Sequence, residues 1–276
     1  MSDSGIPIIT IVTPSYNQGD FVEWTVRSVF EQRYRKLEYI FMDGGSTDST
    51  LERIEPYRGR FAHFESGPDG GQAAAIAKGF EYSTGEIMAY LNSDDVLLPG
   101  TLNFVADFFL QNPKVDFIYG HRCFVNESNE VIRHFILPPH SNFMMRHWYL
   151  MPQETCFWRR SLFEKKGNID SSYRFAMDYD LFVRYMDAGK FKRVNRFLAG
   201  FREHQNSKTS SQLMTLGISE IGRVLSQYKI MSIPVFGPLF HLWVNFRSAY
   251  YINKYQCIPG LPPGKGFNLS DVWGYS

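Results

Sequence analysis

The 276-residue chain has little cysteine and almost no net charge, and each shortage narrows the classes of function it can have. Its three cysteines, Cys123, Cys156 and Cys257, lie far apart and never in CxxC spacing. That pattern argues against a disulfide framework and against a zinc site, so we expect a reducing, cytoplasmic compartment. The formal charge of +1, from 29 basic and 28 acidic residues, provides no field that would favour nucleic acid as a partner.

Long apolar runs and cofactor loops are also missing. No stretch reaches the roughly 18 apolar residues that a membrane-spanning helix needs, and the N-terminus MSDSGIPIITIV lacks a basic signal region. We therefore expect a protein that is not integral to a membrane. No GxGxxG follows the first apolar run, which argues against a dinucleotide oxidoreductase. The chain does have 44% hydrophobic and 16% aromatic residues, enough to bury a large core.

The first hundred residues alternate between short apolar runs and amphipathic stretches. Strands are predicted within 6–14, 37–44, 59–71 and 86–95, and helices within 21–32, 46–57 and 71–83. Ser46 and Thr47 are interpreted as capping residues of the second helix. This order predicts an α/β fold with a mostly parallel sheet, helices on both faces, and ligands at the carboxyl ends of the strands.

A polar cluster follows each predicted strand. These clusters are TPSYN at 13–17, DGGSTD at 43–48, SGPDGG at 66–71 and NSDD at 92–95. Taken singly, each could be a helix cap or an ordinary turn. Because the carboxyl ends of parallel strands meet at one edge of a sheet, the four clusters together indicate one binding site.

Three segments resemble those of a known family. Residues 10–50, TIVTPSYNQGDFVEWTVRSVFEQRYRKLEYIFMDGGSTDST, resemble the opening signature of the inverting family 2 glycosyltransferases. LNSDD at 91–95 is similar to their DxD region, and FAMDYDLFVRY at 175–185 is similar to their later acid motif. The resemblance covers about residues 7–205. It implies the GT-A fold, a nucleotide diphosphate sugar as donor, and Mg²⁺ or Mn²⁺ as cofactor.

The resemblance also implies which residues contact the donor. Thr13, Pro14, Ser15 and Tyr16 match the segment that lines the base, and Asp43 matches an acid that accepts a base N–H. The family usually has two acids after this strand, and the position of the second is occupied by Gly44 here. Other donor contacts implied by the motifs are Gly71 and Gln72 beneath the donor, Lys78 beside its phosphates, and Asn92, Ser93 and Asp94 in the DxD region.

Two neighbouring carboxylates, Asp94 and Asp95, end the last predicted strand of this half. They repel each other and resist burial, so a cation is expected beside them. A divalent cation held there would also offset the charge of a diphosphate leaving group. Asn92 stands where the family usually has Asp, so the metal is expected on Asp94 or Asp95. His204 could add an imidazole, and Arg202 or Lys208 could neutralise phosphate oxygens.

Inverting transfer needs a base that takes a proton from the acceptor hydroxyl. Asp178 matches the acid given that role in the family, although Met177 stands where Glu is common. Asp180 is interpreted as an acid at the start of a helix. Acceptor contacts are expected around residues 148–154, where the candidates are Trp148, Met151, Gln153 and Glu154.

The predicted organisation is a catalytic domain at 1–211, with a nucleotide-binding half to about 100 and an acceptor-binding half from about 101. Residues 212–276 form an aromatic, helical extension and tail that could lie on the inner face of a membrane, pair subunits, or pack back on the catalytic domain. The predicted function is transfer from a nucleotide sugar, UDP-sugar favoured, to a hydroxyl of a glycan or lipid-linked acceptor in surface polysaccharide or glycoconjugate synthesis. The alternatives are a sugar nucleotidyltransferase and a non-catalytic nucleotide-sugar-binding protein.

Overall fold

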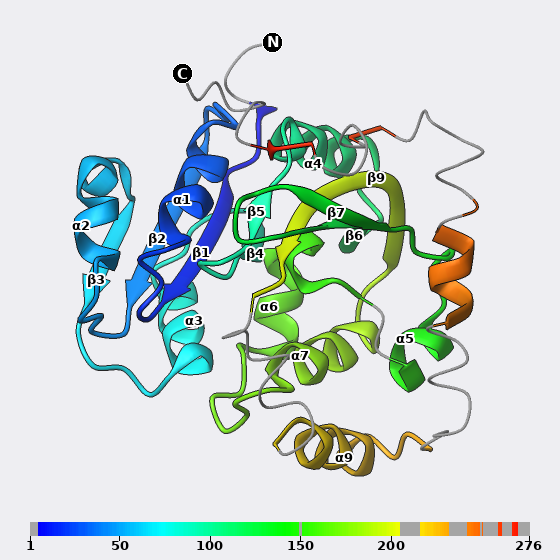
Figure 1. Ribbon diagram of the computed structural model, residues 1–276. Coiled ribbons are helices and arrows are strands. Elements are labelled where there is room, and N and C mark those ends of the chain that lie inside the picture. The colour runs from blue at the N-terminus through cyan, green and yellow to red at the C-terminus, as the bar shows by residue number, and fades with distance from the viewer. Residues whose placement is uncertain are drawn as a thin grey trace.

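The computed structural model describes residues 5–148, 151–204, 216–231, 242–248, 250, 259–260 and 267–269. A nine-stranded sheet runs through the molecule with helices on both faces (Figure 1). The strands are β1 (Ile9–Ser15), β2 (Leu37–Asp43), β3 (His63–Ser66), β4 (Ile87–Tyr90), β5 (Val96–Leu97), β6 (Phe117–Val125), β7 (Val131–Phe135), β8 (Phe157–Arg159) and β9 (Phe191–Arg202). The helices are α1 (Val22–Phe30), α2 (Thr50–Ile54), α3 (Gln72–Glu81), α4 (Thr101–Gln111), α5 (Asn142–Trp148), α6 (Arg160–Lys166), α7 (Met177–Met186) and α9 (Ile218–Gln227), with 3₁₀ turns at Glu55–Arg60 and Gln153–Thr155.

The half of the sheet formed by the first four strands is parallel, in the order β3-β2-β1-β4. A helix connects each of these strands to the next one in the chain, which confirms the predicted alternation. The carboxyl ends of β1 and β2 lie side by side, with Ser15 paired to Asp43. Parallel pairing therefore brings the predicted polar clusters to one edge.

The other half of the sheet is mixed rather than parallel. β8 pairs antiparallel with both β4 and β6, β5 pairs antiparallel with β9, and only β6 and β9 pair in parallel there. β6 and β7 form a hairpin closed at 126–130, and such a short connection requires antiparallel pairing. The expectation of a mostly parallel sheet thus holds for the first four strands and not for the second half.

The sheet separates two apolar cores. On one face α3, α6, α7 and α9 contribute residues such as Ile76, Phe182 and Val224 to a cluster that includes Val12 of β1. On the other face α1, α2 and α4 pack with Ile9 and Ile11 of the same strand. Alternate residues of β1 enter different cores, as expected of a strand covered on both sides.

The prediction for the start of α2 is wrong. The helix begins at Thr50, and Asp48 Oδ1 accepts the Thr50 backbone N–H at 2.9 Å. Ser46 instead accepts the backbone N–H of Asn17 at 2.8 Å and donates to Asp43. The side chains of this turn are used to join the β1 and β2 loops, so they are not available as caps for the helix.

The described part of the predicted extension packs back on the domain. α9 lies beside α7 (Figure 1), and its Val224 is fully buried in the core that α7 shares. The serine-rich run 205–211 and the tail from 270 fall outside the described residues, and so does Lys208. Within the described ranges, no helix is long and apolar enough to cross a bilayer.

Candidate active site

A cavity of about 550 Å³ opens at the carboxyl ends of β1, β2 and β4. It is lined by Pro14, Ser15, Tyr16, Gln18, Gly44, Pro68, Asp69, Gly71, Gln72, Ala75, Asn92, Ser93, Asp94 and Phe201. Each of the four polar clusters that follow the parallel strands contributes residues to this lining. Volume and lining are of the size and mixed polarity that small-molecule sites usually have.

The end of β1 forms one wall. Pro14, Ser15 and Tyr16 line the cavity, and the Tyr16 side chain is 61% exposed, so its ring is accessible to a flat ligand. Thr13 lies beneath that wall. Its hydroxyl is within 3.0 Å of the Tyr39 hydroxyl inside the sheet, so the structure places Thr13 in support of the wall rather than in its surface.

Asp43 was expected to contact the base, but the acid that lines the cavity is Asp69. The Asp43 carboxylate is 3% exposed and accepts hydrogen bonds from the backbone N–H groups of Gly45 and Ser46, at 3.1 and 3.0 Å, and from the Ser66 hydroxyl at 2.7 Å. It therefore holds the turn and does not line the cavity. Asp69 does line it, directly over Gly44: a Cβ at position 44 would lie 3.0 Å from Asp69 Oδ2.

An amide network holds the far wall. The Gln72 side chain, at the start of α3, donates to Asn92 Oδ1 at 2.7 Å. Asn92 in turn donates to Gln153 Oε1 at 3.4 Å, and Gln153 donates to the Tyr90 carbonyl at 2.8 Å. Gly71, with φ of 97°, allows the sharp entry into α3 that puts Gln72 at the cavity. The network fixes the Asn92 side chain in one orientation.

Asp94 and Asp95 point in different directions. Asp94 lines the cavity, and its Oδ2 lies 3.1 Å from His204 Nε2. Asp95 is 1% exposed, and its Oδ1 accepts the backbone N–H of Arg202 at 3.0 Å. Burial, followed by the charges of Asp94 and Glu154, raises the pKa of Asp95 well above its usual range. The carboxylate available to a ligand is therefore that of Asp94.

Arg202 does not have the role predicted from its charge. Its side chain is fully buried and donates to the backbone carbonyls of Asp94 and Asn126, at 2.8 and 2.7 Å, and to the side chain of Asn129. These contacts fasten the Asp94 loop to the end of β6. The expectation that Arg202 neutralises phosphate oxygens is wrong, because its donors are directed at the protein itself.

Lys78 also lies away from the donor side. Its ammonium pairs with Glu65 on an exposed surface, and it is not part of the cavity lining. Helix α3 presents Gln72 and Ala75 to the cavity, and Lys78 is directed elsewhere. The structure therefore does not bring Lys78 to the place where phosphates were expected.

Asp94 and His204 are the residues that could hold a divalent cation. An oxygen and a nitrogen donor converge there, and His204 is held against Phe21 with ring centroids 4.7 Å apart. Among the described residues, no group of three His, Cys, Asp or Glu side chains is placed to bind a metal. Two protein ligands suit a metal whose remaining positions are taken by donor phosphates and water, the usual mode for Mg²⁺.

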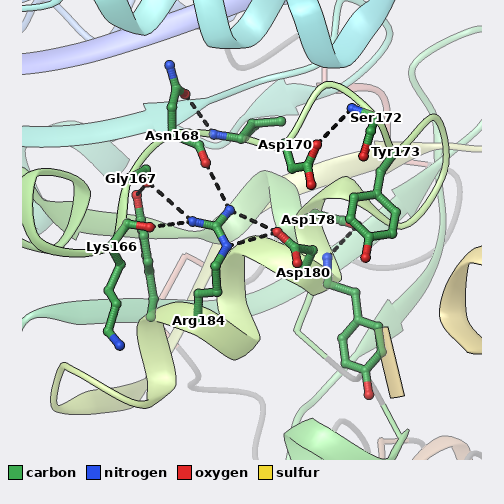
Figure 2. Close-up of polar contacts among 12 residues, drawn as sticks. Lys166, Gly167, Asn168, Asp170, Ser172, Tyr173, Asp178, Asp180 and Arg184 are labelled. Carbon is green, nitrogen blue, oxygen red and sulfur yellow. Dashed lines mark hydrogen bonds and ion pairs between the residues drawn. The ribbon is translucent and has the colours of Figure 1, made fainter. Parts of the chain in front are cut away.

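Asp178 lies in the first turn of α7, near the ion pair of Asp180 with Arg184 (Figure 2). It is half-buried, and its Oδ1 accepts the backbone N–H of Tyr179 at 2.8 Å. After burial, the Asp178 charge is the next cause of the raised pKa of Tyr90, the last residue of β4. Asp178 is not among the residues that line the cavity.

Asp180 is buried and bound to neighbouring side chains. It is 1% exposed and pairs with Arg184 at 2.9 Å, while Tyr228 of the C-terminal extension donates to it at 2.7 Å. Arg184 also donates to the carbonyls of Lys166 and Asn168, at 2.6 and 2.9 Å (Figure 2). With its oxygens engaged in this way, Asp180 stabilises the start of α7.

The predicted acceptor residues are mostly internal. Met151, Gln153 and Glu154 are at most 8% exposed, and Trp148 packs against the core. Glu154 pairs with Arg122 at 3.3 Å, and the Arg122 guanidinium lies 4.9 Å from the centroid of Phe201, a cavity residue. Glu154 thus supports the cavity wall through Arg122 and does not face an acceptor itself.

Gln18 and Phe201 were missed from the sequence. Both line the cavity. Gln18 follows the TPSYN cluster and could have been found by extending that cluster by one residue. Phe201 lies at the end of β9, more than 100 residues after the other strand ends, and no local pattern distinguishes it from a core aromatic residue.

Residues 10–169 match the family model described as glycosyl transferase family 2. The chain belongs to this family. The chondroitin synthase of Pasteurella multocida (strain Pm70) is 28% identical over 199 residues, which cover 69% of this chain but 20% of the relative. The family 2 chain therefore spans about a fifth of the length of that curated relative.

Solved structures confirm the GT-A fold. Staphylococcus aureus TarS 1–349 in complex with UDP superposes with a TM-score of 0.61 at 18% identity, covering 79% of this chain and 64% of TarS. The mannosyltransferase PcManGT of Pyrobaculum calidifontis, in complex with GDP-Man and Mn²⁺, gives a TM-score of 0.60 at 16% identity, covering 97% of this chain and 78% of that one. At these identities the likeness concerns the fold.

Proposed function

We propose that this chain is an inverting glycosyltransferase that transfers a sugar from a nucleotide diphosphate sugar, UDP-sugar favoured, to a hydroxyl of a glycan or lipid-linked acceptor. The observation that carries the proposal is the cavity at the strand ends, where the Asp94 carboxylate and the polar lining meet. Asp178, in the first turn of α7, holds the position of the base in the family's later acid motif. A candidate donor site and a candidate base are thus both present in a chain of the right family.

The donor would enter with its base between the ends of β1 and β2. Tyr16 offers a ring for stacking, and Asp69 offers a carboxylate that can accept a base N–H beside Gly44. Asn92, held by Gln72, offers amide groups to ribose hydroxyls. The binding of UDP by TarS, which has the same fold, supports a uridine donor.

Asp94 and His204 would hold Mg²⁺ or Mn²⁺ beside the donor phosphates. The cation would supply positive charge that lowers the free energy of the departing diphosphate. The presence of Mn²⁺ with GDP-Man in the structurally similar mannosyltransferase supports this cofactor. Asp95 would contribute by keeping the loop in place through the Arg202 backbone, not as a ligand.

Asp178 would act as general base. As the acceptor oxygen attacks the anomeric carbon, the new C–O bond forms on the face opposite the diphosphate, and the acceptor proton passes to the Asp178 carboxylate. The bond to the diphosphate oxygen breaks, and its electron pair leaves with the nucleotide. The configuration at the anomeric carbon is inverted because this is a single displacement.

The biological role proposed is synthesis of a surface polysaccharide or glycoconjugate, in the cytoplasm or at the inner face of a membrane. Similarity to a chondroitin synthase, whose name indicates synthesis of a polysaccharide, supports a glycan acceptor. A lipid-linked acceptor would reach a soluble catalytic domain only at a membrane surface, which is why a peripheral location is included.

The experiment is a thermal-shift screen of nucleotide sugars with Mn²⁺, followed by product analysis. A binding donor raises the melting temperature by mass action, and the donor that does so should release its nucleoside diphosphate when an acceptor is present. Release of pyrophosphate from a nucleoside triphosphate and a sugar 1-phosphate would instead identify a nucleotidyltransferase. Selective donor binding with no turnover on any acceptor or on water would identify a binding protein.

A further inference from the structure

The loop that leads into α7 is held by one carboxylate from the C-terminal extension. Glu220 of α9 accepts the backbone N–H of Arg174 at 2.9 Å, of Phe175 at 2.8 Å and of Ala176 at 2.9 Å. Its side chain is buried, with the residue 8% exposed. Ala176 is the residue that caps the start of α7, and Asp178 follows two positions later.

The Ala176 amide is one of the donors that the start of a helix leaves without a partner, and the Arg174 and Phe175 amides belong to the loop before it. In a capping box the side chain at the third helical position accepts the N-cap N–H, but Tyr179 at that position has no carboxylate or amide group. Glu220, more than 40 residues away in the sequence, supplies the acceptor instead. Burial raises the pKa of Glu220, but its hydrogen bonds to these amides outweigh burial and leave the pKa lower than usual. The carboxylate is therefore charged at neutral pH, and its charge lies at the positive end of the α7 dipole.

Three further side chains of the same segment hold the same loop. Arg223 donates to the Ser172 hydroxyl at 2.7 Å, Tyr173 donates to Gln227 at 3.0 Å, and Tyr228 donates to Asp180 at 2.7 Å. Residues 172–180 are thus fastened from α9 at several points. None of these contacts reaches the donor cavity, whose lining ends at Phe201 in sequence.

We propose that Glu220 is a positioning residue for Asp178, so that the C-terminal extension completes the catalytic half of the site. The inference rests on the proposed function, in which Asp178 is the base. α9 lies beyond residues 10–169, the region that the family model matches.

Without the carboxylate, the N-cap amide of α7 and two amides of the loop before it lose their acceptor. The loop would then rotate to find water or other partners, and the first turn of α7 would move with it. A misplacement of about 1 Å in a reacting group can lower the rate by roughly a hundredfold. The donor cavity has its own supports in the sheet, so donor affinity should not change.

The test is Glu220→Gln, with turnover and donor affinity measured on the same preparation. The amide keeps the size of the side chain but turns one acceptor into a donor that faces N–H groups. We expect kcat to fall about tenfold or more, with the donor Kd within about twofold of wild type. Glu220→Asp keeps the charge but shortens the side chain, and its kcat should lie between those of wild type and Glu220→Gln.

Two controls separate positioning from general stability. Ser219→Ala changes an exposed residue of the same helix and should leave kcat unchanged. Val224→Ala removes a buried apolar contact of α9 and should lower the melting temperature at least as much as Glu220→Gln. Measured well below both melting temperatures, Val224→Ala should keep a higher kcat than Glu220→Gln, because the Glu220 hydrogen bonds are intact.

The outcomes distinguish this inference from the proposed function. If Asp178→Asn abolishes turnover while Glu220→Gln keeps kcat within twofold of wild type, the positioning role is excluded and the function stands. If Asp178→Asn retains normal turnover, the base assignment fails and the positioning role fails with it. If Glu220→Gln does not fold, Glu220→Asp decides, and a kcat equal to wild type in that variant would overturn the inference. In the double variant, the loss should equal that of Asp178→Asn alone, since both changes act on one group.

Discussion

The proposed donor side of this molecule, at the cavity, and the proposed base side, at Asp178, are built in different ways. The donor cavity is formed by the ends of β1, β2 and β4, whose positions are set by sheet pairing within residues 9–90. Asp178 lies in the first turn of α7, whose start is contacted by the side chains of Glu220 and Tyr228 from the C-terminal extension. A sheet distributes its positional control over many backbone hydrogen bonds, whereas the base side depends on a few side chains. The base side should therefore be the more easily disturbed by single substitutions.

The largest effect is expected for Asp178→Asn. Removal of the proton acceptor should lower kcat by roughly a hundredfold or more. Donor affinity should stay unchanged, because the base takes its proton in the transition state and does not contribute to donor binding. Initial rates and donor binding by calorimetry measure the two quantities. Asp180→Asn serves as comparison from the same helical turn and should lower the melting temperature more than the rate per folded molecule. Equal rate losses in both variants would contradict the division of roles.

Arg184→Ala should give the next largest effect, on stability. Asp180 is buried, and the substitution leaves its charge without the ion pair that compensates it. Breaking a buried pair in this way costs about 3 kcal/mol of unfolding free energy. Urea unfolding followed by circular dichroism measures the loss. A change of less than about 1 kcal/mol would mean that the remaining Tyr228 contact is sufficient to hold the start of α7.

On the donor side, Asp94→Asn should weaken metal-dependent donor binding by roughly tenfold to a hundredfold. The amide keeps the shape of the side chain but lacks the charge that a divalent cation needs, and the melting temperature should stay nearly unchanged. Titration of donor with and without chelator measures the effect. Asp107→Asn, at an exposed position of α4, is the matched control. Donor affinity indifferent to both chelator and Asp94→Asn would remove the metal from the proposal.

Acid should weaken the base side through Glu220. The folded pKa of Glu220 is lowered relative to the unfolded value of roughly 4.3, so its contribution to stability is complete above that pH. The contribution is lost as pH falls through the folded pKa. The melting temperature of Glu220→Gln should thus be lower than that of wild type at pH 7, and the difference should shrink as pH approaches 3. A constant difference across this range would show that the Glu220 charge does not stabilise the fold.

The smallest effect is expected for Lys78→Ala. Lys78 pairs with Glu65 on an exposed surface, and exposed ion pairs contribute little. Donor affinity should stay within about twofold of wild type, as measured in the same titration. A larger loss would return Lys78 to the phosphate site and would imply that α3 turns when a donor binds.

The sequence by itself determined the fold class and the edge of the sheet where the site lies. Apolar runs near residues 9–15 and 37–43 and the helix between them are local patterns, and parallel pairing of such strands brings their polar ends together. Eight residues named in advance line the cavity: Pro14, Ser15, Tyr16, Gly71, Gln72, Asn92, Ser93 and Asp94. Each of them lies at the end of a strand, in the turn that follows a strand, or at the start of a helix, so its placement depends on local structure.

Only the tertiary structure decided where the charges of the site point. Asp94 faces the cavity and Asp95 the interior because Arg202 and His204, more than 100 residues away, contact them on opposite sides. Arg202 is consumed by internal carbonyls, Asp43 by its own turn, and Lys78 by Glu65, although sequence alone makes each a plausible donor contact. Glu220 had no role in any motif, yet it caps α7. A motif specifies which side chains are available, but burial and partners distant in the chain determine which of them remain free for a ligand.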